Sequence, residues 1–359
     1  MTYPLLRALP QHLNQTYKHH NIMSNLTLED IAKMAGVSRA TVSRVINDHP
    51  NVRQSLRDRV KEIIEETGYQ PNLAARSLVS QETKLIGLVI PRGVHGFFTD
   101  PYFPRLVEGI SQACNQYGYS FSLSLFHNDK EERELFPKVT KKGFLDGIVV
   151  QATGLGLNVT PPISEWNIPY VFAGRPVNAP NVSYIDVDNV AGAYSAIAHL
   201  AQLGYRRIAT VTGTLNSSVG RDRLEGYRKA VLERGLETDE SLIIEGDFTE
   251  FGAYYATKRL IQDKPPEAIF CASDTMAIGV MKALRDDGLL VPHDIAVVGF
   301  DDLLPATLTV PQLTTVRQPV RRFGFKAVET LIDIINNGPE PPRRIIFDTE
   351  LVIRGSCGS

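Results

Sequence analysis

The sequence contains little cysteine, with only three in 359 residues. Cys114, Cys271 and Cys357 lie far apart along the chain, so they provide neither a disulfide framework nor the paired spacing of a zinc site. A protein with so few cysteines fits a reducing compartment. We therefore expect a cytoplasmic protein that has no disulfide bonds and needs no metal.

Long apolar runs are also absent, and none approaches the roughly 18 residues of a membrane span. The first residues contain only the short cluster "PLLRALP", which prolines interrupt and which lacks the core of a signal peptide. We expect no contact with a membrane and a disordered tail over residues 1–25. Order is expected to begin near Leu26, and Met23 is well placed to start translation.

The chain as a whole lacks a strong excess of either charge, since its formal net charge is −2. This balance excludes a polybasic coat over the entire molecule. The distribution is uneven, because residues 31–64 hold seven Lys/Arg but three Asp/Glu. A local positive field of this kind is what phosphate binding requires.

The basic segment begins with the pattern of a short helix. In "LTLEDIAKMAG", apolar residues recur at positions 28, 31, 32 and 35, which is the spacing of one helical face. Thr27 can cap the start of this helix, with Asp30 three residues on as in a capping box. Gly36 supplies the residue that ends it.

A second short helix follows in "SRATVSRVIN", which Ser38 can cap. Its apolar residues point one way, whereas Arg39 and Arg44 lie on the other faces. Two helices joined by a tight turn form a helix-turn-helix, and arginine can bind guanine while hydroxyl groups bind phosphate. The same residues would also suit an ordinary helical hairpin with a solvated polar face. A third amphipathic helix ends at Gly68.

The pattern of apolar and polar residues changes at residue 85. The segment before it, at 71–84, has too few apolar residues to pack alone. From residue 85 apolar strands alternate with helices over about 250 residues, as in doubly wound parallel sheets. The strands are too many for one ordinary sheet, so we expect two α/β lobes. The expected first lobe comprises about 85–182 and 318–341, and the second about 183–317 and 342–359.

Several separate motifs together resemble the lactose/purine repressor (LacI/GalR) family, across residues 26–355. They include "TLEDIAKMAGVSRATVSRVIN", "GYQPNLAARSL", "VDNVAGAYSAIAHLAQLGYRRIATVTG" and "ASDTMAIGVMKALRDDGLLVPHDIAVVGFDD", in the order that the family has them. The resemblance implies a helix-turn-helix head at 26–70, a hinge helix at 71–84 and two lobes of periplasmic-binding-protein type at 85–359. It implies a sequence-specific transcriptional regulator, which we expect to be a repressor.

The resemblance also implies the partners of the chain. They are a near-palindromic double-stranded operator, a second copy of the chain, and a small-molecule effector between the lobes, which we expect to be a sugar or sugar derivative. A dimer through the α/β lobes is favoured over a tetramer, because the sequence ends without a leucine-heptad segment. Neither the operator, the effector nor the sign of its action follows from the sequence.

The DNA-binding residues are transferred from the family position by position. The base-reading set is Arg39, Ala40, Arg44 and the hinge residue Leu78, which would wedge into a base step in the minor groove. The phosphate-binding set is Thr27, Ser38, Thr41, Ser43, Asn47, Arg53, Tyr69 and Asn72. Without the resemblance, the Leu78 segment would be interpreted as a plain linker.

The effector-binding set follows in the same way, because such ligands bind at the carboxyl ends of strands. It is Arg223, Asp301, Phe248, Ser273, Gln318, Arg175 and Phe98. Taken alone, Asp301 could be a strand-end cap and Phe248 a core residue. The sequence departs from the family at Gly174, where a carboxylate is common, at Ser273, where asparagine is frequent, and in the longer loop "GVHGFFTDPYF".

Two other classes of function are disfavoured. A transport receptor would need a signal peptide and would have no use for the basic helical head. An enzyme is disfavoured because the sequence contains no phosphate-binding loop, no paired histidine ligands and no nucleophile elbow. We therefore expect neither catalysis nor a cofactor.

Overall fold

The computed structural model describes residues 26–69, 82–91, 94–141, 143–152, 163–177 and 179–358. The chain divides into two compact units, Met1–Glu82 and Thr83–Ser359. None of the described helices combines the length and the apolar character that a membrane span requires.

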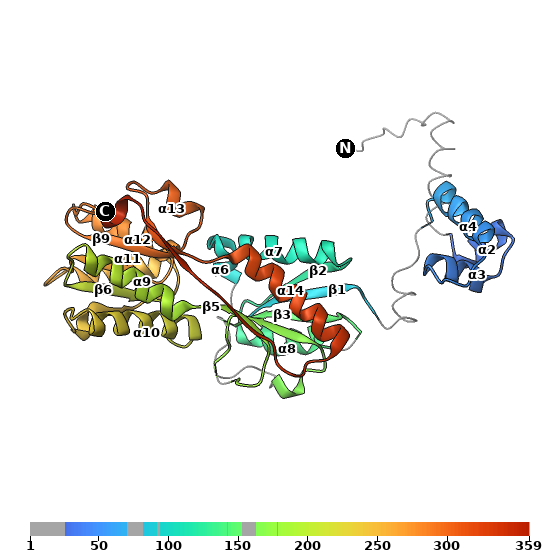
Figure 1. Cartoon of the computed structure of the whole chain (residues 1–359), viewed down its shortest axis with the longest axis horizontal. Coiled ribbons are helices and arrows are strands. Elements are labelled where there is room, and N and C mark those ends of the chain that lie inside the picture. Colours follow the sequence, from blue (N-terminus) through green and yellow to red (C-terminus); the bar gives the residue numbers. More distant parts are fainter. Residues whose placement is uncertain are drawn as a thin grey trace, which may run out of the picture. The chain divides into compact units, whose positions relative to one another are not determined.

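The described residues of the first unit form three helices, which are α2 (Leu28–Ala35), α3 (Arg39–Ile46) and α4 (Gln54–Thr67) (Figure 1). The predicted caps are confirmed, because Thr27 and Asp30 form a capping box and Gly36 ends α2 with a φ of 63°. Ser38 caps α3 through a hydrogen bond from the backbone of Thr41. The buried residues that these helices share are Ile31, Ala32, Ala35, Val42, Val45, Val60 and Tyr69.

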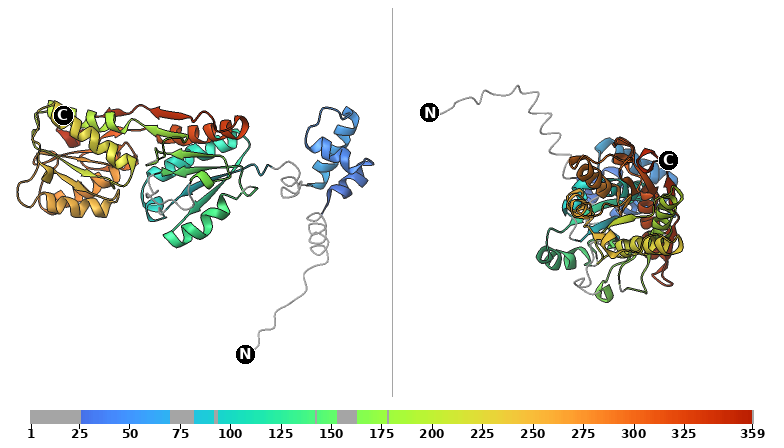
Figure 2. Two further views of the ribbon diagram at one scale, coloured as in Figure 1. Left: turned by 90° about the horizontal axis from the view of Figure 1, so that it is seen from below. Right: turned by 90° about the vertical axis from the view of Figure 1, so that its left-hand side faces the viewer.

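The second unit contains two α/β lobes, with helices on both faces of each sheet (Figures 1 and 2). In the first lobe all strands are parallel, in the order β11-β5-β4-β3-β1-β2. These strands are β1 (Leu85–Ile90), β2 (Ser120–Leu125), β3 (Gly147–Gln151), β4 (Tyr170–Ala173), β5 (Tyr184–Val187) and β11 (Arg344–Phe347). The helices are α6 (Val94–Thr99), α7 (Tyr102–Gln116), α8 (Asp129–Val139) and α14 (Val320–Asn337).

The second lobe has the strand order β12-β10-β9-β8-β6-β7, parallel except for the pair β10 and β12. Its strands are β6 (Ile208–Thr212), β7 (Ile243–Glu245), β8 (Ala268–Cys271), β9 (Ala296–Asp301), β10 (Thr314–Arg317) and β12 (Glu350–Val352). Its helices are α9 (Asn189–Gln202), α10 (Ser218–Glu233), α11 (Glu250–Leu260), α12 (Asp274–Asp286) and α13 (Leu304–Leu308). Short 3₁₀ helices lie at Ile163–Glu165, Glu240–Leu242 and Gly355–Cys357.

Strand residues are apolar on both sides because each sheet is covered on both faces. In β1, Ile86 and Leu88 pack in the cluster under α7 and α14, whereas Val89 packs in the other cluster with Phe136 of α8. The helices α7 and α14 approach closely, since a Cβ on Gly109 would lie 1.9 Å from the carbonyl oxygen of Arg321. Continuous apolar strands are therefore the expected signature of this architecture.

The expected lobe boundaries near residues 183 and 342 are wrong by a few residues. Tyr184–Val187 pairs with β4, and Arg344–Phe347 pairs with β5, so both strands belong to the first sheet. The chain crosses between the lobes after β5, after β10 and between β11 and β12. The sequence pattern identified these strands but not their neighbours, because β5 and β11 pair across more than 150 residues of chain.

Candidate functional site

A cavity of about 440 Å³ lies between the two lobes, at the carboxyl ends of their strands. Its size is within the range of small-molecule sites. The residues around it are Ile90, Pro91, Gly96, Asp100, Tyr102, Phe103, Gln151, Gly174, Asp186, Val187, Asn189, Thr214, Asn216, Val219, Arg223, Asp247, Phe248, Thr249, Ser273, Asp301, Gln318 and Phe323. Both lobes contribute, so the cavity depends on their mutual position.

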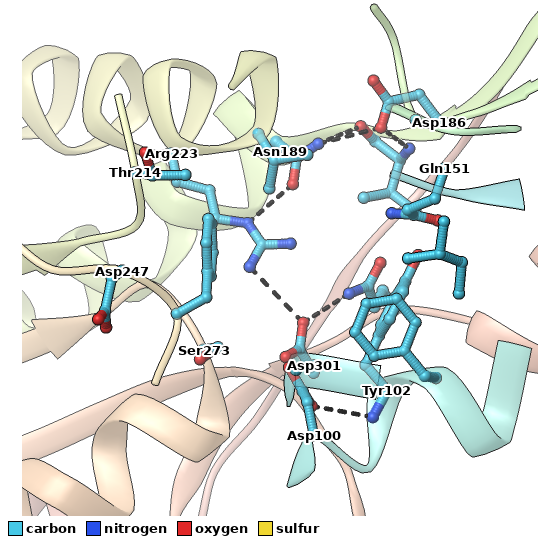
Figure 3. Close-up of a pocket in the computed structure, with 18 of the residues that line it drawn as sticks. Asp100, Tyr102, Gln151, Asp186, Asn189, Thr214, Arg223, Asp247, Ser273 and Asp301 are labelled. Carbon is cyan, nitrogen blue, oxygen red and sulfur yellow. Dashed lines mark hydrogen bonds and ion pairs between the residues drawn. The ribbon is translucent and has the colours of Figure 1, made fainter. Parts of the chain in front are cut away.

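Five polar side chains form a connected network across this cavity, and Figure 3 labels four of them, Asp186, Asn189, Arg223 and Asp301. Asp186 at the end of β5 accepts a hydrogen bond from Asn189, and Asn189 accepts one of 2.8 Å from Arg223 Nε. Arg223 forms an ion pair of 3.6 Å with Asp301, which also accepts a hydrogen bond from Gln318. This network of side chains therefore extends from the first lobe through α9 and α10 to the end of β9.

Arg223 is the central residue of this polar network and is almost completely buried. Its guanidinium lies 3.6 Å from the centre of the Phe300 ring, and its Nη1 donates to the carbonyl oxygen of Ala272. Burial lowers the pKa of Arg223, and the nearby Asp301 partly offsets this effect. Its third nitrogen, Nη2, donates no hydrogen bond to any other described residue. A ligand oxygen in the cavity can accept from this nitrogen.

Asp301 is buried and has a φ of 122°, a conformation that side chains rarely adopt. Burial raises its pKa well above the ordinary value, Arg223 opposes this shift, and the carboxylates of Asp274 and Asp100 add to it. Asp274 does not line the cavity, and it is held by Thr315 and by the backbone of Leu303.

The first lobe contributes two further carboxylates. Burial raises the pKa of Asp186 to about 6, although the backbone of Val187 and of Arg175 donates to it. Asp100 accepts hydrogen bonds from the backbone of Tyr102 and from the hydroxyl of Thr275 in the second lobe. Burial also raises the pKa of Asp100. These groups surround the ligand position with hydrogen-bond acceptors.

Aromatic rings provide the apolar part of the lining. Phe248 follows β7 and has a φ of 64°. Its ring lies directly against Gly213, because a Cβ on that glycine would be 1.9 Å from Phe248 Cζ. Tyr102, Phe103 and Phe323 line the cavity from the first lobe.

Five of the seven expected effector-binding residues line the cavity, namely Arg223, Asp301, Phe248, Ser273 and Gln318. Ser273 is buried and also caps α12 through a hydrogen bond from Met276. Arg175 is not part of the lining, because its guanidinium is paired with Asp222 of the opposite lobe. Phe98 is also outside it, with 73% of its surface exposed.

The structure adds lining residues that the sequence interpretation missed, among them Asp100, Tyr102, Gln151, Asp186 and Asn189. Asp186 could have been found, since it is the polar residue next to the carboxyl end of the strand "YIDV". Asn189 joins the local Asp186 to Arg223, which lies 34 residues further along the chain, and no local pattern reveals this distant partner. Within the described ranges, no group of three or more His, Cys, Asp or Glu side chains is arranged to hold a metal.

In the head, the predicted base-reading residues Arg39, Ala40 and Arg44 are exposed on α3. Among the predicted phosphate ligands, Thr27, Ser38, Asn47 and Arg53 are exposed, whereas Thr41 and Ser43 are half-buried. Tyr69 packs in the core of the head, with 7% of its surface exposed. Asn72 and Leu78 lie outside the described residues.

Comparison with known proteins agrees with this two-part architecture. Residues 27–72 match the model of the bacterial regulatory proteins of the lacI family, and residues 197–357 match the periplasmic binding protein-like domain. The HTH-type transcriptional regulator CelR of Thermobifida fusca is 37% identical over 333 residues, which cover 92% of this chain and 98% of CelR. The chain belongs to the lacI family of bacterial regulatory proteins.

Other lacI-family relatives are similar over nearly the whole chain. The HTH-type transcriptional repressor PurR of Haemophilus influenzae (strain PittEE) is 34% identical over 93% of this chain and 99% of PurR. A structure of a CelR–cellobiose complex matches with a TM-score of 0.73 at 36% identity, over 92% of this chain and 100% of that chain. The lac repressor dimer bound to operator and the anti-inducer ONPF matches with a TM-score of 0.80 at 26% identity, over 93% and 99%.

Proposed function

We propose that this lacI-family regulator is a cytoplasmic transcriptional repressor whose operator affinity is controlled by a sugar bound between its lobes. The observation that carries the proposal is the buried polar network centred on Arg223 and Asp301. It presents a donor at Arg223 Nη2 and acceptors on several carboxylates to one cavity. CelR, a relative of similar length, is known in complex with the sugar cellobiose.

Sugar chemistry fits this lining. A hydroxyl group both donates and accepts hydrogen bonds, so it can donate to Asp301 while another accepts from Arg223. The ring of Phe248 offers an apolar surface against the CH face of a pyranose.

For DNA, we propose that α3 reads the major groove through Arg39, Ala40 and Arg44. Ala40 offers only a methyl group to the bases, so discrimination should depend on the two arginines, each worth roughly 1–3 kcal/mol per bidentate contact. The hydroxyl and amide groups at Thr27, Ser38, Thr41, Ser43 and Asn47 would hold phosphates, with Arg53, Tyr69 and Asn72. Leu78 would wedge into the minor groove from a hinge helix.

We further propose that two copies pair through the second lobe. The helices α11 and α13 pack on the same face of its sheet, and several of their exposed side chains are large and apolar. The exposed residues there are Phe251, Tyr255, Leu304, Leu308 and, just after α13, Val310. Large apolar side chains exposed on one face of a domain are typical of protein interfaces. Sedimentation of the full chain should give a dimer that Phe251→Asp dissociates, whereas Leu232→Asp, on α10, should not; a wild-type monomer refutes the pairing.

The experiment that tests the function has two steps. Selection from a random DNA library should enrich a near-palindromic operator, and a panel of sugars should then change the affinity for that operator. Asp301→Asn keeps an acceptor oxygen and a residue that tolerates positive φ, so we expect unchanged operator binding and an effector response weakened at least tenfold. Asp287→Asn, at the surface of the same lobe, is the control and should respond like the wild type. An Asp301→Asn protein with a wild-type response would remove Asp301 from the site.

A further inference from the structure

The charges that line the cavity are strongly unbalanced. Four carboxylates, those of Asp100, Asp186, Asp247 and Asp301, face one guanidinium, that of Arg223, among the described lining residues. Asp247 is exposed and accepts hydrogen bonds from Thr249. Its negative charge is therefore the least costly of the four to keep ionised. The other three belong to the deeper part of the site, where water screens charges less.

The single guanidinium is already in use. Arg223 is paired with Asp301 at 3.6 Å, and it is held by Asn189 and by the carbonyl oxygen of Ala272. Arg175, which follows a strand of the first lobe, is bound to Asp222 outside the lining. An anionic ligand would therefore find no unpaired cation among the described residues of the cavity. Arg223 Nη2 can still serve a neutral hydroxyl oxygen.

The carboxylates also oppose further negative charge. Burial, with a contribution from Asp274 and Asp100, raises the pKa of Asp301, and burial raises that of Asp186 to about 6. A phosphate adds about −1.5 to −2 charges at pH 7. The raised pKa values show that burial disfavours negative charge here, so a phosphate placed within a few ångströms would be disfavoured for the same reason and repelled by the carboxylates that are ionised.

We propose that the cavity selects uncharged sugars and rejects their phosphorylated or carboxylated counterparts. The proposal rests on the proposed function, because it concerns the ligand class of the same cavity. Selectivity arises from repulsion by Asp100, Asp186 and Asp301, and from the prior engagement of Arg223. A neutral sugar satisfies the carboxylates by donating hydroxyl hydrogen bonds, whereas a phosphate has only acceptors to offer in its ionised form.

The test is calorimetry of the full chain with matched ligands. A panel of neutral mono- and disaccharides, including cellobiose, is first used to find a binder. The binder is then compared with its 6-phosphate and with its 6-O-acetyl counterpart, which adds bulk without charge. We expect the 6-phosphate to bind at least tenfold more weakly than the parent sugar, and the acetyl form to stay within about threefold. Asp100→Asn should narrow the gap between parent and phosphate, because it removes one repelling charge.

Each other outcome has a distinct meaning. A 6-phosphate that binds as well as the parent overturns the charge selectivity but leaves the sugar effector in place. Equal losses for the phosphate and acetyl forms show exclusion by size and also overturn it. Arg92 follows Pro91 in the sequence and lies outside the described residues, so Arg92→Gln is included; phosphate binding that this change abolishes would overturn the proposal in favour of an anion site. A panel in which no neutral or anionic sugar binds overturns the sugar effector itself.

Discussion

At the scale of single residues, the cavity contains two side chains on unusual backbone. Phe248 and Asp301 have φ values of 64° and 122°, and both line the ligand site. Non-glycine residues in these regions cost of order 1–3 kcal/mol and persist where the surrounding structure requires them. Here the conformation places a ring and a carboxylate in the same cavity, so the strained positions coincide with the proposed binding groups.

Gly213 controls where the Phe248 ring lies. A Cβ at this position would be 1.9 Å from Phe248 Cζ, so Gly213→Ala must displace the ring. We expect the effector to bind about 5- to 150-fold more weakly, since overpacking typically costs about 1–3 kcal/mol. Calorimetry measures this loss, and operator binding without effector serves as the control and should be unchanged. Wild-type effector affinity in Gly213→Ala would show that the ring does not contact the ligand.

Asp186 gives the first lobe a defined pH dependence. Its pKa is raised to about 6 in the folded chain, so the folded state holds a proton that the unfolded chain releases near pH 4. Its contribution to stability is therefore complete below about pH 4 and is lost as the pH rises through 6. Relative to the wild type, Asp186→Asn should gain up to about 2–3 kcal/mol in unfolding free energy between pH 4 and 7.

Urea unfolding can be followed through Trp166, a buried residue of the first lobe and the only tryptophan of the chain. The difference in unfolding free energy between variant and wild type isolates the contribution of Asp186. This comparison is needed because Asp274 and Asp301 also have raised pKa values. A difference that stays constant from pH 4 to 7 would show that the carboxyl group of Asp186 is not shifted by burial.

At the scale of elements, Ser38 serves α3 in one way that the structure shows and in another that we propose. Its Oγ accepts a hydrogen bond of 3.1 Å from Thr41 and caps the helix. A cap changed to alanine costs about 1 kcal/mol, whereas glycine costs only a few tenths. Ser38→Gly therefore removes the hydroxyl with little effect on stability.

If Ser38 also holds a phosphate, Ser38→Gly should bind the operator several-fold more weakly while the head melts at nearly the wild-type temperature. Fluorescence anisotropy and thermal circular dichroism measure the two quantities, and Ser38→Ala is the matched variant that should lose both. Wild-type operator affinity in Ser38→Gly would limit Ser38 to capping.

The sequence predicted these elements well because their signals are local. Apolar periodicity, capping residues and glycine ends placed α2, α3 and α4 and most strands, since each signal depends on residues within one or two turns. The lobe boundaries were misplaced because β5 and β11 are assigned to a sheet only by partners far along the chain. The strand-end position of Asp301 followed from local signals and its place in the effector site from the family resemblance, whereas Asn189 and Asp100 depend on contacts with distant elements.

At the scale of the whole effector-binding unit, polar contacts join the two lobes beside the cavity. Arg175, which follows β4, donates from Nη2 to both carboxylate oxygens of Asp222 in α10, at 2.6 and 2.5 Å. Ser218 of α10 donates to the carbonyl oxygen of Arg175, and Thr275 donates to Asp100. These contacts can form only while the lobes are close together, so they favour the closed arrangement, and Arg175, Ser218 and Asp222 do so from outside the cavity lining.

Weakening this connection should therefore reduce effector affinity indirectly. Arg175 is partly exposed, so the pair with Asp222 is worth about 0.5–1.5 kcal/mol after allowance for solvent screening. A ligand that binds the closed state then has its apparent affinity reduced by the fraction of closed molecules. We expect Arg175→Gln and Asp222→Asn each to weaken effector binding about 2- to 10-fold and to increase the radius of gyration of the unliganded protein in solution scattering.

The double variant should bind the effector no more weakly than either single variant, because the second change removes an interaction that is already lost. Arg228→Gln and Glu240→Gln break an ion pair within the second lobe alone and should leave both measurements unchanged. Losses that simply add in the double variant would mean that Arg175 and Asp222 act independently, and the lobes would then be held closed by other contacts.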